Sequence, residues 1–174
     1  MKITQEVLAR KEAATSFEKY CQYVGGVTPA KHHRLICNKI QDVLDGKNKR
    51  LIICAPPGSA KSTYSSLLLP SFALGYKGKY KLIGGSHTQE LAEDFSRKIR
   101  NQLGSQEYQN VFPNVQVSAD ARAASRWTTT AQGSYLASGV GAGKGACVTV
   151  PAGSTGAGAT GRHGPHCGLQ ARYH

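Results

Sequence analysis

The stretch LIICAPPGSAKST, from Leu51 to Thr63, decides how the rest of the chain is interpreted. It begins with an apolar, strand-prone run, passes through a turn that contains proline and glycine, and ends in Lys-Ser-Thr. A strand, a glycine-bearing turn and the start of a helix in this order are typical of a phosphate-binding loop. We therefore predict a strand at Leu51–Ala55, followed by a helix that begins near Ala60 and ends at Pro70, which has no N–H to donate.

The residues of this loop suit the binding of a triphosphate. The N-terminus of a helix offers several backbone N–H groups and the positive end of the helix dipole. Gly58 loosens the turn, Lys61 places a positive charge near the outer phosphates, and the Ser62 hydroxyl can bind Mg²⁺. The cradle that we predict consists of Pro57, Gly58, Ser59, Ala60, Lys61, Ser62 and Thr63.

The loop departs from the strict pattern G-x-x-x-x-G-K-[ST], because Ala55 and Ala60 occupy the two glycine positions. A Cβ atom penalises positive φ, so we expect Ala60 to fit only with a negative φ. The alternative is a plain strand–turn–helix with an exposed lysine. The apolar run before the loop and the Ser-Thr after the lysine count against that alternative.

Composition narrows the function classes. The chain has 174 residues, enough for one domain with a sizeable core, and a formal net charge of +12 with a pI near 9.7. Such a charge favours an anionic partner such as nucleic acid or a nucleotide, although it also serves solubility alone. No apolar run approaches the roughly 20 residues that span a bilayer, and the N-terminus carries acids and lacks a secretory signal pattern.

The five cysteines form no C-x-x-C pair, so we interpret them as reduced thiols of a cytosolic protein.

Hydrophobic periodicity predicts further elements on both sides of the loop. Helices are expected at Thr4–Val24, Lys31–Leu44 and in SHTQELAEDFSRKIRNQL, where Ser86 and Gln89 have capping-box spacing and Gly104 follows the last turn. Strands are expected at 80–85, 115–118 and 133–140. The alternation of strands and helices predicts an α/β domain with parallel pairing.

After Gly143 the composition changes to a tail rich in Gly, Ala and Thr. We expect two parts: an α/β domain at residues 1–143 and a low-complexity tail at 144–174 that is disordered or out of frame. ACVTV is the one strand-prone segment of the tail. A metal site is the less favoured interpretation of its Cys147, His163, His166, Cys167 and His174, because H-x-x-H-C matches no standard zinc spacing.

Four blocks occur in an order that resembles one family. They are PAKHHRLICNKIQDVLDGKNKRLIICAPPGSAKST, LLLPSFALG, SHTQELAEDFSRKIRNQL and RWTTTAQGSYLASGVGAG. Together they resemble the N-terminal ATPase region of the large terminase subunit of tailed phages and prophages, over roughly Ser16 to Gly143. The resemblance implies a P-loop NTPase fold, here an incomplete parallel sheet with flanking helices, and ATP with Mg²⁺ as cofactors.

The resemblance also implies residue roles and partners. His33 lies where terminases contact adenine, with a solvated helix start as the alternative. Arg97 and Arg100 lie on a helix that in terminases carries an arginine proposed to reach the nucleotide of a neighbouring subunit; a plain basic helix face is the alternative. Trp127 and Thr128 match a strand block and are interpreted as structural. The implied partners are double-stranded phage DNA, the small terminase subunit, the portal and a homo-oligomeric ring in the host cytoplasm, without a membrane.

The chain departs from the family after GVGAG. In terminases an apolar strand ending in two acids follows, and those acids hold Mg²⁺ and orient the attacking water. Here no Asp or Glu follows Asp120, and a nuclease domain with its carboxylate cluster is missing. We therefore expect ATP binding with weak or absent hydrolysis, from a reading frame or gene that changed near Gly143. The alternatives are a fragment without function and a basic nucleic-acid-binding module.

Overall fold

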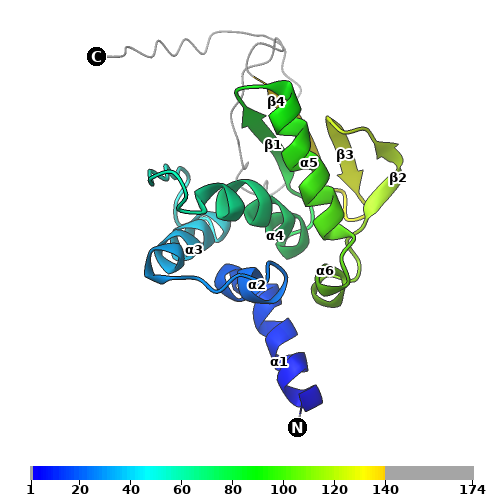
Figure 1. Cartoon of the computed structure of the whole chain (residues 1–174). Helices are drawn as coiled ribbons and strands as arrows, with labels where there is room; N and C mark the ends of the chain where they lie inside the picture. The colour runs from blue at the N-terminus through cyan, green and yellow to red at the C-terminus, as the bar shows by residue number, and fades with distance from the viewer. Residues whose placement is uncertain (1, 140–174) are drawn as a thin grey trace.

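The computed structural model describes residues 2–139, without the side chains of residues 2, 3 and 119–122. Within this range the chain forms a mixed α/β fold, with helices on one side and a four-stranded sheet on the other (Figure 1). Its elements are α1 (Lys2–Thr15), α2 (Phe17–Tyr23), α3 (Lys31–Leu44), the π-helix η1 (Thr63–Leu68), α4 (Leu69–Tyr76), β1 (Lys81–Ser86), α5 (Gln89–Leu103), α6 (Gln106–Val111), β2 (Val117–Arg122), β3 (Arg126–Thr129) and β4 (Ser134–Gly139).

The single helix predicted from Thr4 to Val24 is wrong, because it is divided at Ser16. Ser16 is extended, with φ −117° and ψ 122°. The N–H of Phe17 donates to Oε1 of Gln41, 2.9 Å away on α3, instead of continuing the first helix. The break turns the chain so that α2 buries Phe17, Tyr20 and Cys21.

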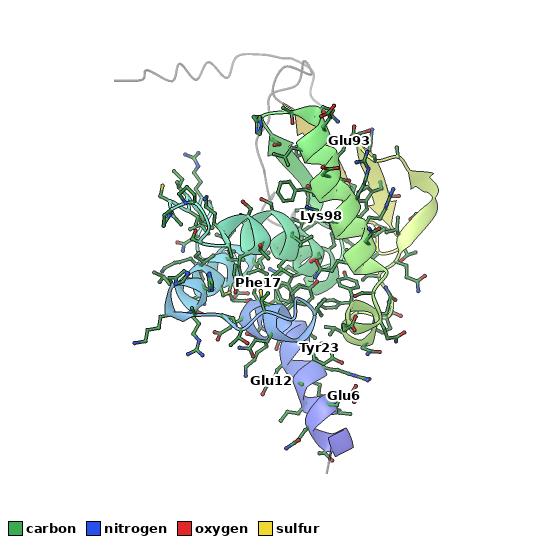
Figure 2. The ribbon with its side chains drawn as sticks, in the orientation of Figure 1. Glu6, Glu12, Phe17, Tyr23, Glu93 and Lys98 are labelled. Carbon is green, nitrogen blue, oxygen red and sulfur yellow. The ribbon has the colours of Figure 1, made fainter. Side chains whose placement is uncertain are left out.

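An aromatic cluster forms the centre of the helical part. Tyr20 lies 5.0 Å from Phe72 and 6.3 Å from Tyr108 between ring centroids, and its hydroxyl donates to Ser71 Oγ at 2.8 Å. Phe17 packs into the same cluster, while Glu6 and Glu12 stand on the protruding α1 (Figure 2). Burial raises the pKa of the Tyr20 and Tyr108 hydroxyls, which stay neutral inside this core.

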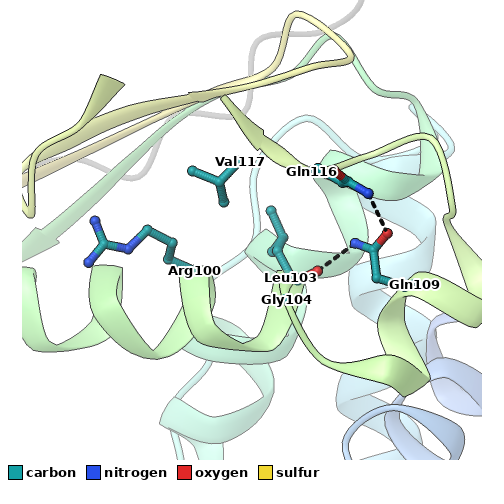
Figure 3. Close-up of a pocket in the computed structure, with 6 residues that line it drawn as sticks. All are labelled: Arg100, Leu103, Gly104, Gln109, Gln116 and Val117. Atoms are coloured by element: carbon teal, nitrogen blue, oxygen red, sulfur yellow. Dashed lines mark hydrogen bonds between the residues drawn. The ribbon is translucent and has the colours of Figure 1, made fainter. Parts of the chain in front are cut away.

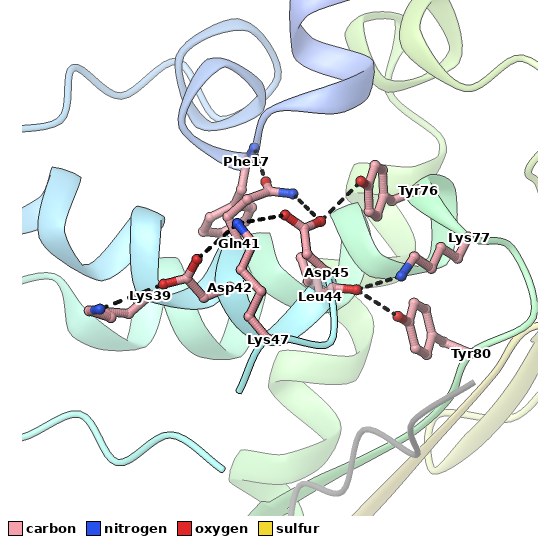
Figure 4. A network of polar contacts seen from close by, with 10 residues as sticks. All are labelled: Phe17, Lys39, Gln41, Asp42, Leu44, Asp45, Lys47, Tyr76, Lys77 and Tyr80. Carbon is pink, nitrogen blue, oxygen red and sulfur yellow. Dashed lines mark hydrogen bonds and ion pairs between the residues drawn. The ribbon is translucent and has the colours of Figure 1, made fainter. Parts of the chain in front are cut away.

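The predicted helix Lys31–Leu44 is confirmed, and a polar network fixes its C-terminal end (Figure 4). The Leu44 carbonyl accepts from Nζ of Lys77 at 2.6 Å and from the hydroxyl of Tyr80 at 3.4 Å. Asp45 accepts from Gln41 at 3.0 Å. These bonds tie the C-terminal end of α3 to the end of α4 and to the chain just before β1. They therefore fix the position of the whole helix, including its N-terminal end.

The helix after the loop does not stop at Pro70, as the sequence predicted, but continues to Tyr76. A π-helical turn precedes the proline, and the N–H of Leu69 bonds to the carbonyl of Tyr64, five residues back. This widened turn displaces the carbonyls that a proline ring would meet in a regular α-helix. The Ser71 hydroxyl, just after the proline, donates to the Leu68 carbonyl at 3.0 Å.

The sheet has the order β1-β4-β3-β2. The predicted parallel pairing is confirmed for β1 with β4, whereas β3 pairs antiparallel with both β4 and β2. The predicted strand at 115–118 begins at Val117 instead and extends to Arg122. Helix α5 packs on β1 and β4. Trp127 of β3 is fully buried, in agreement with its interpretation as a structural residue.

The capping box predicted for α5 is wrong. Ser86 is the last residue of β1, and Thr88 is the N-cap, whose hydroxyl oxygen accepts from the N–H of Leu91 at 3.3 Å. Threonine is also a favoured N-cap residue, and the end of the strand decides which residue is free to cap the helix. The end of α5 at Leu103, followed by Gly104, agrees with the prediction.

The strand predicted at Leu51–Ala55 is wrong, although the segment is apolar. No strand of the described sheet pairs with it, and within the described residues its backbone makes no hydrogen bond. Ile52 is 87% exposed and Leu51 is 37% exposed. β-Propensity produces a strand only when a neighbouring strand supplies the hydrogen bonds, and none of the strands within residues 2–139 pairs with this segment.

Because an unpaired apolar segment is a template for association, we predict that Ile52→Lys reduces self-association of the protein. The matched control is Val7→Lys, which removes a 45%-exposed valine from a helix whose backbone is already bonded. Sedimentation velocity over a concentration series measures the effect. An equal change in both variants would show that general hydrophobicity, and not the unpaired segment, drives association.

The remaining predictions concern the cysteines, membrane-spanning segments and the C-terminal tail, and the structure tests only some of them. Cys21, Cys37 and Cys54 are free thiols, as expected, and every helix within residues 2–139 is too short or too polar to cross a membrane. The domain boundary at Gly143, the ACVTV strand, the expected character of the tail and its candidate metal ligands lie outside the described residues.

Candidate phosphate-binding site

The loop borders an open groove beside α3. The groove has a volume of about 660 Å³, and its walls come from the first two turns of α3 and from residues 53–59. In Figure 1 this segment and α3 lie together on the side of α4 away from α5. The lining residues are His32, His33, Leu35, Ile36, Ile53, Cys54, Ala55, Pro56, Pro57, Gly58 and Ser59, and none of them is a carboxylate.

Two residues of the loop have a left-handed backbone conformation. Gly58 has φ +79° and Ala60 has φ +54°. The expectation of a negative φ at Ala60 is therefore wrong. The backbone there has the conformation that the glycine of the strict motif allows, and alanine adopts it with strain of about 1 kcal/mol.

The loop presents unused donors where the next helix begins. The N–H groups of Thr63 and Tyr64 already bond to the Ala60 carbonyl, at 3.0 and 3.3 Å. The N–H groups of Ala60, Lys61 and Ser62 have no hydrogen-bond acceptor within the described residues. Unused donors at the first turn of a helix can accept an anion.

The side chains of Lys61 and Ser62 are at least partly exposed at the same place. Nζ of Lys61 reaches back over the loop and donates to the Pro56 carbonyl at 3.4 Å, a long bond that an anion can replace. Ser62 is exposed immediately after it. Lys61 and Ser62 therefore lie together at the start of the helix, as the sequence predicted.

The structure assigns His33 contacts that the sequence did not indicate. Nδ1 accepts from the N–H of Ala30 at 3.2 Å, and Nε2 lies 3.1 Å from the carbonyl oxygen of Ser59 in the loop. The ring stacks on Tyr64, with centroids 4.7 Å apart and planes at 28°. Both ring nitrogens are engaged by the polypeptide, so an edge contact with an adenine base would displace one of these bonds.

Two more features of the site escaped the sequence analysis. The Ser59 Oγ atom is buried and has no hydrogen-bond partner among the described residues, which suits a ligand that supplies one. Tyr64 is 1% exposed, lies beneath His33, and has a hydroxyl whose pKa burial raises. Ser59 was predicted only as part of the phosphate cradle, and neither its buried hydroxyl nor the place of Tyr64 beneath His33 could be predicted, because both depend on tertiary packing.

The two candidate arginines lie elsewhere. Arg97 is paired within α5, at 2.7 Å to Asp94 and 3.5 Å to Glu93. Arg100 lines a separate groove of about 510 Å³ at the end of α5, opposite Gln109 and Gln116 (Figure 3). Neither Arg97 nor Arg100 is among the described residues that line the loop groove, so these two arginines do not lie at the loop of their own chain.

Comparisons of the chain with models of protein families, with curated proteins and with solved structures found no match.

The strain at Ala60 leads to a stability prediction. Ala60→Gly removes the Cβ atom at a positive φ and should raise the free energy of unfolding by about 1 kcal/mol, partly offset by the greater chain entropy of glycine in the unfolded state. The matched control is Ala9→Gly inside α1, which should lower it by about 1 kcal/mol. Urea unfolding of both variants measures the two changes in the free energy of unfolding. Changes of the same sign would contradict a left-handed conformation at Ala60.

Proposed function

We propose that this chain is the nucleotide-binding part of a DNA-packaging terminase large subunit and that it binds ATP with Mg²⁺ through residues 57–63. The observation that carries the proposal is the loop itself: unused N–H groups, Lys61 and Ser62 converge where a helix begins. The buried, unpartnered Ser59 hydroxyl also fits a ligand at this place. In the intact family, hydrolysis of bound ATP drives viral DNA into the capsid.

The proposed assignments follow the loop. The N–H groups and Lys61 would hold the phosphates, and the Ser62 hydroxyl would bind Mg²⁺, which neutralises phosphate charge. An adenine base would lie in the groove beside the histidines of α3. Arg97 and Arg100 would act on the nucleotide of a neighbouring subunit, since neither of them lines the groove of the loop.

We propose that hydrolysis by this chain is weak or absent. Among the residues that the structure describes, no carboxylate lines the loop groove, and the sequence has no acid after Asp120. Phosphoryl transfer requires an acid that helps to hold the metal and a group that positions the attacking water. Binding without turnover is the expected behaviour.

A second candidate function is a basic nucleic-acid-binding module. The net charge is +12, and Lys49 and Arg50 are exposed just before the loop. Electrostatic binding to DNA phosphates weakens steeply with salt. DNA binding with that dependence, in a protein that binds no nucleotide, would favour this candidate.

Titration calorimetry with ATP and Mg²⁺, together with an assay of phosphate release, tests the proposal. We expect saturable binding at one site and phosphate release no faster than in buffer. Absence of binding would sink the proposal. Phosphate release that disappears on Lys61→Ala would overturn the prediction of an inactive loop while keeping the site.

A further inference from the structure

We propose that His33 is a positioning residue for the phosphate loop and acts by holding the Ser59 carbonyl from the first turn of α3. The inference rests on the proposed function, because the position of the loop affects ligand binding only if the loop is the binding site. It differs from a base contact: His33 would shape the cradle for the phosphates.

The contacts of His33 determine where its proton lies. A backbone N–H can only donate, so Nδ1, 3.2 Å from the N–H of Ala30, is the acceptor. A neutral imidazole then carries its proton on Nε2, and Nε2–H donates to the Ser59 carbonyl at 3.1 Å. The Ala30 contact therefore selects the tautomer that can hold the loop.

The ring is also held in place by its neighbours. It stacks on Tyr64, which is buried on η1, the element that begins where the loop ends. The His32 ring lies 3.9 Å away between centroids. His33 thus connects the helix before the loop with the helix after it, and α3 is anchored at its far end by the Leu44 network.

The loop needs such a support. Ser59 lies between two residues with positive φ, and one of them is an alanine. A strained loop is ordered only when its surroundings hold it. The three unused N–H groups follow Ser59 directly, so fixing its carbonyl orients them before a ligand arrives. Pre-organisation of this kind lowers the ordering cost of binding.

Three substitutions separate the contacts of His33. His33→Gln can place an amide N–H near the position of Nε2 and keep the bond to Ser59. His33→Asn can accept from Ala30, as Nδ1 does, but is too short to reach Ser59. His33→Phe keeps an aromatic ring against Tyr64 and loses both hydrogen bonds. Thermal unfolding of each variant establishes that it is folded before its binding is compared.

The probes are Mg²⁺ with ATP and Mg²⁺ with inorganic tripolyphosphate, which has no base. We expect His33→Asn and His33→Phe to weaken both ligands about tenfold, the effect of losing one well-placed hydrogen bond. His33→Gln should stay within about twofold of the wild type. Weakening of ATP alone would show that His33 contacts the base, and equal losses in the Gln and Asn variants would show that the Ser59 bond is not what matters; either result overturns the inference.

A measurement without ligand distinguishes failure of this inference from failure of the proposed function. We expect amide hydrogen exchange at residues 59, 63 and 64, whose N–H groups bond to the carbonyls of Pro56 and Ala60, to be faster in His33→Asn than in the wild type and unchanged in His33→Gln. If the wild type binds neither ATP nor tripolyphosphate, the proposed function fails whatever the exchange shows. If it binds both and exchange is the same in all variants, the positioning role alone fails.

Discussion

Replacing Lys61 with alanine is expected to weaken the binding of Mg²⁺-ATP about 100-fold, because a hydrogen-bonded charge at a phosphate is worth about 1.5–3 kcal/mol. The ammonium group is free to turn toward a ligand, since its bond to Pro56 is long at 3.4 Å. The same weak attachment means that the side chain contributes little to the fold. We expect the free energy of unfolding to change by less than about 0.5 kcal/mol.

The control is Lys11→Ala, which removes the same charge from an exposed position on α1. It should leave ATP binding unchanged within about twofold, whereas a loss caused by net charge alone would affect both variants equally. Titration calorimetry at fixed ionic strength gives both values. Undiminished binding by Lys61→Ala would place the nucleotide site elsewhere and remove the basis of the proposed function.

The largest effect on stability is expected for Trp127→Ala, a loss of about 4 kcal/mol in the free energy of unfolding. Trp127 is fully buried, and its ring stacks on Tyr135 with centroids 5.3 Å apart. Its Nε1–H donates to Ser96 Oγ on α5 at 2.8 Å, inside the core. Truncation leaves a cavity between the sheet and α5 and removes the partner of a buried hydroxyl. Total stabilities are about 5–15 kcal/mol, so the variant is expected to be largely unfolded at moderate urea concentrations.

Two smaller substitutions separate the contribution of the hydrogen bond from that of packing. Ser96→Ala removes the hydrogen bond and leaves the packing, at a cost of about 1 kcal/mol. Trp127→Phe loses the bond and part of the volume and should lie between the two. Urea unfolding followed by circular dichroism measures the series. A loss below about 1 kcal/mol for Trp127→Ala would mean that α5 does not pack on this face of the sheet.

Helices whose apolar face and end signals both lie within their own segment were predicted correctly from the sequence. Helix α5 repeats apolar residues every four positions and is followed by Gly104, and α3 has an apolar face and ends just before Gly46. These signals lie within the segment itself, so the chain around it does not change the outcome. The position of the phosphate loop is equally local, because the whole signal lies within residues 51–63.

Other features depended on contacts between distant parts of the chain. The break at Ser16 is stabilised by Gln41, 25 residues away in sequence. The conformation of Ala60 is set by a loop whose neighbouring carbonyl is held from α3. The family resemblance suggested a base contact for His33, whereas its bond to Ser59 exists only when α3 lies beside the loop.

The apolar run before the loop shows most clearly which features the local sequence determines and which depend on tertiary contacts. Its composition determines that it is strand-prone and that the turn after it suits a phosphate. Whether it becomes a strand depends on a neighbour, because the hydrogen bonds of a strand are made with other segments. The sequence by itself therefore determined the location of the loop, its lysine and serine, and the two amphipathic helices; the tertiary structure decided which apolar segments pair, where strain is held and which side chain supports the loop.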